Sequence, residues 1–235
     1  MSETQIRVIN LQKRYGPIEA LRGVSFAVKR GSVTAFLGEN GAGKTTTIKI
    51  ILGFLRSDSG LVEMNCGRLG FVPDRPVFLS WLTGKEILEA TARLYQIDRL
   101  KLDNLIEEFS TRICFDLALL KRKPHTYSLG NQKKISYLQN LIIEPELLIV
   151  DEPFAGLDPV SIKQTRDLFL ELKRRRKTVF LSSHLISELE KICDEVVIIR
   201  RGKILLEGPL QELCPAGEGN LEALFLSLHP QAEID

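Results

Sequence analysis

The sequence predicts an α/β fold with an all-helical insertion. Four short runs are apolar at every position, as expected for strands buried on both faces of a parallel sheet. Helical patterns follow several of these runs, an alternation typical of α/β proteins. Between about 82 and 144 only helical patterns occur. The four apolar runs are 33–37, 147–150, 178–181 and 196–199.

The first thirty residues have a different pattern. Residues 6–11 and 24–29 alternate between apolar and polar side chains, with Val24, Phe26 and Val28 on the inward face. Such alternation indicates strands with one buried and one solvated face. We therefore expect a half-exposed antiparallel layer beside the main sheet.

Three helices are predicted within the helical insertion. Thr83 and Glu86 have the spacing of a capping box and start the first helix. The second spans roughly 101–114 and the third about 131–143, ending before Pro145.

The last third of the chain returns to α/β patterning. Residues 161–175 carry apolar side chains at helical spacing. A strand is expected at 203–206 and a closing helix near 221–228.

Composition excludes several classes of protein. The 235 residues contain 32 Lys and Arg against 30 Asp and Glu, a net charge of +2, whereas a dedicated nucleic-acid binder usually has a strong basic excess. No apolar run approaches the roughly 18 residues of a membrane-spanning helix, and the first ten residues lack the pattern of a signal peptide. The four cysteines are scattered, without metal-site spacing. We therefore expect an intracellular protein with one large domain, or one domain that carries a modest subdomain, and not two independent domains.

A phosphate-binding motif, G-x-x-x-x-G-K-[ST], lies between the strand 33–37 and a helix at 45–54. Its glycines let backbone N–H groups curl around a phosphate, and the helix N-terminus adds partial positive charge. Lys44 supplies a charge for the β- and γ-phosphates, and the Thr45 hydroxyl is a ligand for Mg²⁺. The predicted P-loop comprises Gly38, Glu39, Asn40, Gly41, Ala42, Gly43, Lys44, Thr45 and Thr46.

Two carboxylates end the apolar strand 147–150. Because charges are costly inside a sheet, Asp151 and Glu152 are expected at its carboxyl edge, where α/β sheets bind ligands. Asp151 would hold Mg²⁺, and Glu152 would orient and deprotonate an attacking water. The alternative is a solvated acidic turn, which the upstream P-loop disfavours.

With these motifs in this order, the chain resembles the nucleotide-binding subunits of ABC (ATP-binding cassette) transporters over essentially its whole length. The resemblance also covers Tyr15 at the adenine-stacking aromatic, residues 70–74 at the Q-loop, 127–131 at the signature, 155–159 at the D-loop and His184 at the switch histidine.

The resemblance implies a P-loop NTPase fold with a RecA-like α/β core, an antiparallel β layer and an inserted all-helical subdomain. All 235 residues would form a single ABC ATPase domain. The core and β layer would comprise about 1–75 and 145–210, the helical subdomain about 76–144 and a helical tail about 211–235.

The resemblance further implies ATP and Mg²⁺ as cofactors and a head-to-tail pair of subunits. Ser128 and the Gly130 N–H would contact the γ-phosphate held by the second subunit, and Asp158 would lie at the seam. His184 would reach the γ-phosphate and help Glu152 to hold the attacking water.

Three features depart from the family pattern. Asp74 replaces the usual glutamine: it is either a Mg²⁺ ligand that alters the relay to the membrane partner or only a turn residue. The signature contains Leu129 and Asn131 in place of glycine and glutamine, which predicts a working but weaker trans site. The short segment 57–70 predicts a trimmed antiparallel layer.

The function implied is ATP hydrolysis that energises an ABC transporter through separate transmembrane permease subunits, at the cytoplasmic face of the cell membrane. The tail resembles that of exporter-type members, and no nucleic-acid partner is expected. One alternative is an ABC ATPase acting on ribosomes or DNA, although the chain lacks a second cassette, coiled coils and zinc modules. Another is a regulatory cassette, suggested by Leu129 and Asp74 and opposed by Glu152 and His184.

Overall fold

The computed structural model describes residues 3–215 and 220–228. The chain divides into two compact units. The discontinuous unit contains residues 1–65 and 178–235, and the central unit contains residues 66–177. The central unit has other limits than the expected helical subdomain at about 76–144, so that subdomain stays a prediction.

The main sheet of the discontinuous unit has β3 (Val33–Leu37) between two parallel neighbours, β7 (Thr178–Ser183) and β8 (Glu195–Arg200). β9 (Lys203–Pro209) pairs antiparallel with β8. Every residue of β3 and β7 is buried, which confirms the inference drawn from their continuous apolar runs.

The predicted antiparallel layer is confirmed. β1 (Thr4–Tyr15) lies between β2 (Ile18–Lys29) and β4 (Ser59–Met64), and segment 57–70 contributes only β4 to it. The Phe26 ring of this layer stacks on Phe36 of β3 at 5.2 Å and on Phe180 of β7 at 5.6 Å. Each buried ring contributes about 2 kcal/mol to this contact between the layer and the sheet.

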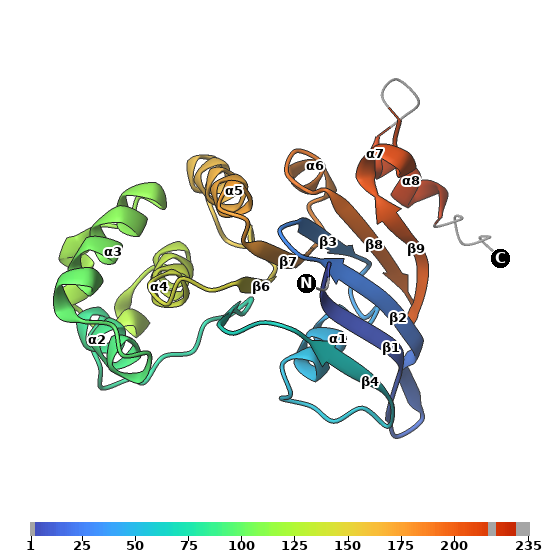
Figure 1. Cartoon of the computed structure of the whole chain (residues 1–235), viewed down its shortest axis with the longest axis horizontal. Helices are drawn as coiled ribbons and strands as arrows, with labels where there is room; N and C mark the ends of the chain where they lie inside the picture. The colour runs from blue at the N-terminus through green and yellow to red at the C-terminus, as the bar shows by residue number, and fades with distance from the viewer. Residues whose placement is uncertain (1–2, 216–219, 229–235) are drawn as a thin grey trace. The chain divides into compact units, whose positions relative to one another are not determined.

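Among its described residues, the discontinuous unit has four helices. α1 (Lys44–Ile51) follows β3, α6 (Ile186–Leu189) follows β7, and α7 (Leu210–Leu213) follows β9. The predicted closing helix is present as α8 (Leu221–Ser227), and Figure 1 shows it with α7 beside β9. Of the predicted tail, residues 216–219 and 229–235 lie outside the described residues.

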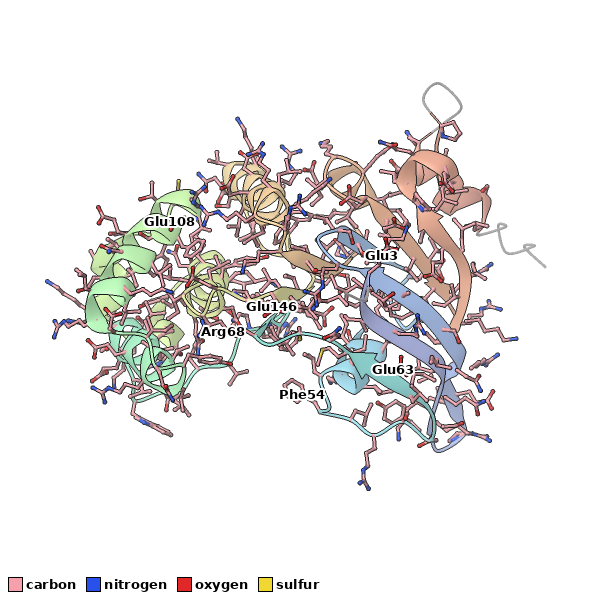
Figure 2. All side chains as sticks on the ribbon, viewed as in Figure 1. Glu3, Phe54, Glu63, Arg68, Glu108 and Glu146 are labelled. Carbon is pink, nitrogen blue, oxygen red and sulfur yellow. The ribbon has the colours of Figure 1, made fainter. Side chains whose placement is uncertain are left out.

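The central unit contains a parallel strand pair and the longer helices. β5 (Leu69–Val72) pairs with β6 (Leu147–Asp151). Figure 2 labels Arg68 and Glu146 just before these strands, where the Arg68 carbonyl accepts from the Glu146 N–H at 2.9 Å. The helical elements are α2 (Gly84–Leu94), α3 (Arg99–Arg112), two short 3₁₀ turns η1 (Leu117–Lys121) and η2 (Pro124–Thr126), α4 (Leu129–Leu141) and α5 (Pro159–Arg174).

Capping residues explain where these helices start. The predicted box is present: Thr83 Oγ1 accepts from the Glu86 N–H at 3.3 Å, and a Glu86 carboxylate oxygen accepts from the Thr83 N–H at 2.7 Å. α3 and α4 each begin two residues earlier than predicted, because Asp98 and Ser128 cap them.

Arg175, which follows the last residue of α5, forms ion pairs with α3 and with α5 itself. Arg175 Nη2 lies 2.6 Å from Glu108, which is labelled in Figure 2, and Arg175 Nε lies 3.0 Å from Glu171. Exposed pairs of this kind contribute little stability. Among the helices of the described ranges, none has the length and apolarity required to span a lipid bilayer.

Candidate functional site

The P-loop joins β3 to α1 in the discontinuous unit. Gly43, the residue before α1, has φ 113°. A Cβ at this position would lie 2.7 Å from Leu21 Cδ2 and 2.9 Å from the Ala20 carbonyl oxygen, so a larger residue would be excluded. Gly41 also has a positive φ, 82°, but its Cβ direction faces open space. The loop is therefore tightly packed on one side and open on the other, as a phosphate cradle requires.

Lys44 places a positive charge inside this loop. Its side chain is buried, and Nζ donates to the carbonyl oxygens of Gly38 at 2.6 Å and Glu39 at 3.1 Å. The Ala42 N–H also donates to the Glu39 carbonyl, at 3.1 Å, which closes the turn. An ammonium group at a helix N-terminus favours binding of an anion. The exposed loop residues are Glu39, Asn40, Gly41 and Thr45, and Thr46 is half-buried.

His184 emerges at the same sheet edge as the P-loop. Leu37 of β3 is in register with Ser183 of β7, so Gly38 and His184 follow directly at the carboxyl ends of adjacent parallel strands. The His184 side chain is exposed, and its carbonyl accepts from the Ile186 N–H at 3.1 Å. The discontinuous unit thus brings together two of the predicted site elements.

Tyr15 ends β1 and remains half-exposed. Lys13 Nζ lies 5.9 Å from the centre of its ring, a weak cation–π contact. Its role in stacking on adenine stays a prediction.

In the central unit, Asp151 and Asp74 leave the sheet at one edge. Val72 of β5 is in register with Val150 of β6. Asp151 is buried at the end of β6, and Asp74 follows β5 by two residues. Glu152 has φ 50°, a left-handed conformation that is rare for a residue with a side chain. The general base predicted from the sequence therefore lies on a strained backbone.

A residue that sequence reasoning missed, Lys133, lies at the centre of this region. It belongs to α4, is completely buried, and burial lowers its pKa to about 8. Lysine is ordinarily exposed on a helix, so its sequence position gave no signal. Helical spacing does place Lys133, Tyr137 and Asn140 on one face of α4, and that pattern could have drawn attention to it.

The signature and D-loop residues serve as helix caps in the central unit. Ser128 Oγ accepts from the Asn131 N–H at 3.3 Å at the start of α4. Asp158 accepts from the Val160 and Ser161 N–H groups, both at 3.0 Å, and the Ser161 hydroxyl bond lowers its pKa.

The departure at Leu129 has a local partner in the D-loop. A Cβ on Gly156 would lie only 2.6 Å from Leu129 Cδ2, so the leucine packs directly against this glycine. Gly130 has only ordinary contacts in the direction of its missing Cβ, the nearest being the Gly156 carbonyl at 3.7 Å.

The polar groups fit a nucleotide-bound Mg²⁺ better than a metal held by protein alone. Within residues 3–215 and 220–228, no group of three or more His, Cys, Asp or Glu side chains could hold a metal ion. Mg²⁺ typically needs only one or two carboxylates when phosphate oxygens supply the other ligands. Asp151 and Asp74 are carboxylates of the kind required, and Thr45 carries a hydroxyl; their roles as Mg²⁺ ligands stay predictions.

Comparison with known proteins identifies the family. Residues 21–155 match the family model described as ABC transporter. An ABC transporter ATP-binding protein of Methanocaldococcus jannaschii is 34% identical over 89% of this chain and 79% of its own length. The bacitracin transport ATP-binding protein BcrA of Bacillus licheniformis is 36% identical over 89% of this chain and 71% of its own length. Two cyanobacterial relatives are longer, and the chain spans only 60% and 62% of them.

A solved structure described as the ATP binding subunit of an ABC transporter has the same fold. It superposes with a TM-score of 0.86 at 28% identity, covering 96% of this chain and all of the other. The predicted fold class, a P-loop NTPase with an antiparallel layer and helices, is confirmed. The chain therefore belongs to the ABC transporter family, in which it is an ATP-binding subunit.

Proposed function

We propose that the chain hydrolyses ATP to drive an ABC exporter through separate transmembrane permease subunits. The observation that carries this proposal is the P-loop, in which the buried Lys44 ammonium lies against the loop carbonyls at the N-terminus of α1. The family match supports the ATPase class.

The proposed chemistry gives each predicted site residue a separate role. Lys44 and the P-loop amides bind the phosphates, and Tyr15 stacks on the adenine. Glu152 orients and deprotonates the attacking water, and His184 holds that water against the γ-phosphate. Thr45, Asp151 and Asp74 would hold Mg²⁺, which would supply positive charge beside the phosphates.

A second nucleotide-binding subunit completes the site. In this proposal Ser128 and the Gly130 N–H contact the γ-phosphate held by the second subunit, because anions bind well at a helix N-terminus and α4 begins there. Asp158 lies at the seam between the two subunits.

The membrane partner docks on the central unit. The segment after β5 exposes Val77, Leu79 and Trp81, with 91%, 52% and 65% of their surface accessible. Beside it is a groove of about 280 Å³ lined by Phe71, Phe78 and Leu94 among others. A groove lined by both apolar and polar side chains suits an amphipathic helix of a permease, which would hold the chain peripherally at the cytoplasmic face of the membrane. The relative named for bacitracin transport and the closing helix α8 support an exporter.

ATP binding and turnover test the proposal. The purified chain, alone or with its permease, is expected to hydrolyse ATP. Lys44→Ala should weaken ATP binding at least about hundredfold, because the charge-assisted hydrogen bonds that Lys44 would donate to the β- and γ-phosphates are lost. Unchanged affinity would mean that the phosphate site is wrongly assigned, and a wild-type chain without turnover in either state would favour a regulatory cassette. Co-purification of ribosomes instead of a membrane protein would contradict the transport role.

A further inference from the structure

Lys133 makes an arrangement of contacts that no motif accounts for. Its side chain is fully buried, with no exposed surface. Nζ donates to the carbonyl oxygens of Pro73 and Asp74, both at 3.1 Å, and to those of Asp151 at 3.1 Å and Glu152 at 2.8 Å. An ammonium has three N–H groups, so four carbonyls use its full donor capacity.

These four carbonyls belong to two segments far apart in the chain. Pro73 and Asp74 follow β5, whereas Asp151 and Glu152 end β6. A buried charge is stable only where hydrogen bonds compensate for its lost hydration. The position of each segment is therefore coupled to the other through one charged atom.

The Glu152 carbonyl is the closest of the four. Because Glu152 has φ 50°, its peptide groups are held in an unfavourable conformation that persists only when neighbouring groups determine it. The bond from Lys133 at 2.8 Å supplies such a determinant. This hydrogen bond fixes the backbone of Glu152. It goes to the carbonyl oxygen and not to the carboxylate that would act on water.

The same face of α4 makes further contacts with both segments. Tyr137, one turn beyond Lys133, donates its hydroxyl to the Pro153 carbonyl at 3.3 Å. Asn140, almost one turn further, accepts from the Phe71 N–H at 2.8 Å. Because Ser128 of the signature caps α4, one helix joins the signature to the Q-loop and to the acidic strand end.

We propose that Lys133 is a positioning residue that locks the Q-loop backbone and the strained Glu152 backbone to the signature helix. The proposal rests on the ATPase function proposed above. In this arrangement a displacement of α4 at the signature moves the metal-ligand and water-activating segments together. The lysine itself contacts neither phosphate nor water.

The test compares Lys133→Met, which keeps the length but removes every donor, with Lys133→Gln, which keeps two N–H donors. Lys134→Met is the matched control. The neighbouring Lys134 donates to the Cys114 carbonyl at 3.1 Å and to none of the four carbonyls that Lys133 contacts. Backbone hydrogen exchange is followed in peptides covering 71–77 and 150–156, with the P-loop peptide 36–46 as internal reference. The turnover rate and the KM for ATP are measured on the same full-length proteins.

We expect Lys133→Met to speed exchange in both segments by about tenfold and to leave the P-loop peptide unchanged. kcat should fall by at least about tenfold, whereas KM should stay within about twofold. Lys133→Gln should recover part of both losses, and Lys134→Met should behave as wild type.

Unchanged exchange in both segments of a folded Lys133→Met protein would overturn the proposal, as would equal changes in the P-loop peptide. If Lys133→Met does not fold, Lys133→Gln decides: exchange equal to wild type with a normal kcat overturns the proposal as well. A wild-type chain that neither binds nor hydrolyses ATP would refute the proposed function, while the exchange data would still test the role of Lys133 separately.

Discussion

The P-loop of the discontinuous unit and the acidic strand end of the central unit are held in place in different ways. In the P-loop, the hydrogen bonds of the buried lysine are local: Lys44 Nζ donates to carbonyls five and six residues away. At the acidic strand end, Lys133 bonds carbonyls 18 to 60 residues away. The contacts of Lys44 are therefore local, whereas those of Lys133 are long-range; in the proposed mechanism the first serve phosphate binding and the second serve hydrolysis.

The largest effect that would separate binding from hydrolysis is expected at Glu152. Glu152→Gln keeps the size of the side chain but removes the base, so kcat should fall at least about hundredfold. ATP affinity should be retained, since the P-loop lies in the other unit. The turnover rate and the equilibrium affinity for ATP measure the two effects. A parallel loss of both would show that binding and hydrolysis do not depend on separate segments.

The packing of the P-loop against Ala20 and Leu21 is tested by Gly43→Ala. The new Cβ would meet Leu21 and the Ala20 carbonyl at a positive φ, so we expect unfolding to become easier by at least about 2 kcal/mol.

Gly16→Ala is its matched control. Gly16 also has a positive φ, 57°, but no atom lies within 4 Å of the added Cβ. Its cost should be only about 1 kcal/mol. Urea unfolding compares the variants, and equal losses would mean that packing around the P-loop contributes nothing.

A smaller effect is expected at Tyr137, which donates one neutral hydrogen bond to the acidic strand end. Tyr137→Phe should lower the free energy of unfolding by about 1 kcal/mol and leave kcat within about twofold of wild type. If its kcat fell as far as that of Lys133→Met, packing of α4 and not the charge of Lys133 would hold the segment.

The smallest effect is expected at Leu129, which is 49% exposed and packs on Gly156. Leu129→Ala should cost about 1 kcal/mol of stability because part of an apolar side chain is lost. Turnover should change little, since Ser128 and Gly130 remain. A rise in the turnover rate of about tenfold or more would instead support the alternative in which Leu129 weakens hydrolysis and the chain is a regulatory cassette.

The sequence predicts well what depends on neighbouring residues. The buried strands, the capping box at Thr83 and the P-loop all follow from patterns within a few residues, and the structure confirms them. Helix starts were wrong by two residues at α3 and α4, where the capping residues Asp98 and Ser128 had not been identified as N-caps.

Lys133 could not be predicted in the same way. A lysine next to a second lysine in a helix normally indicates a solvated face, and only the fold brings four carbonyls to its ammonium. The left-handed backbone of Glu152 is likewise invisible in a motif, because the residue type alone indicates nothing unusual.

The order of strands has a consequence for synthesis of the chain. β3 has β7 on one side and β8 on the other, and both are translated more than a hundred residues after it. The nascent P-loop segment therefore leaves the ribosome with both strand edges unpaired, and it must wait for the whole central unit to follow. During that interval the exposed apolar strand can pair with the wrong partner. Ribosome-bound chains that end at about residue 177 should therefore bind chaperones much more than chains that extend past residue 200.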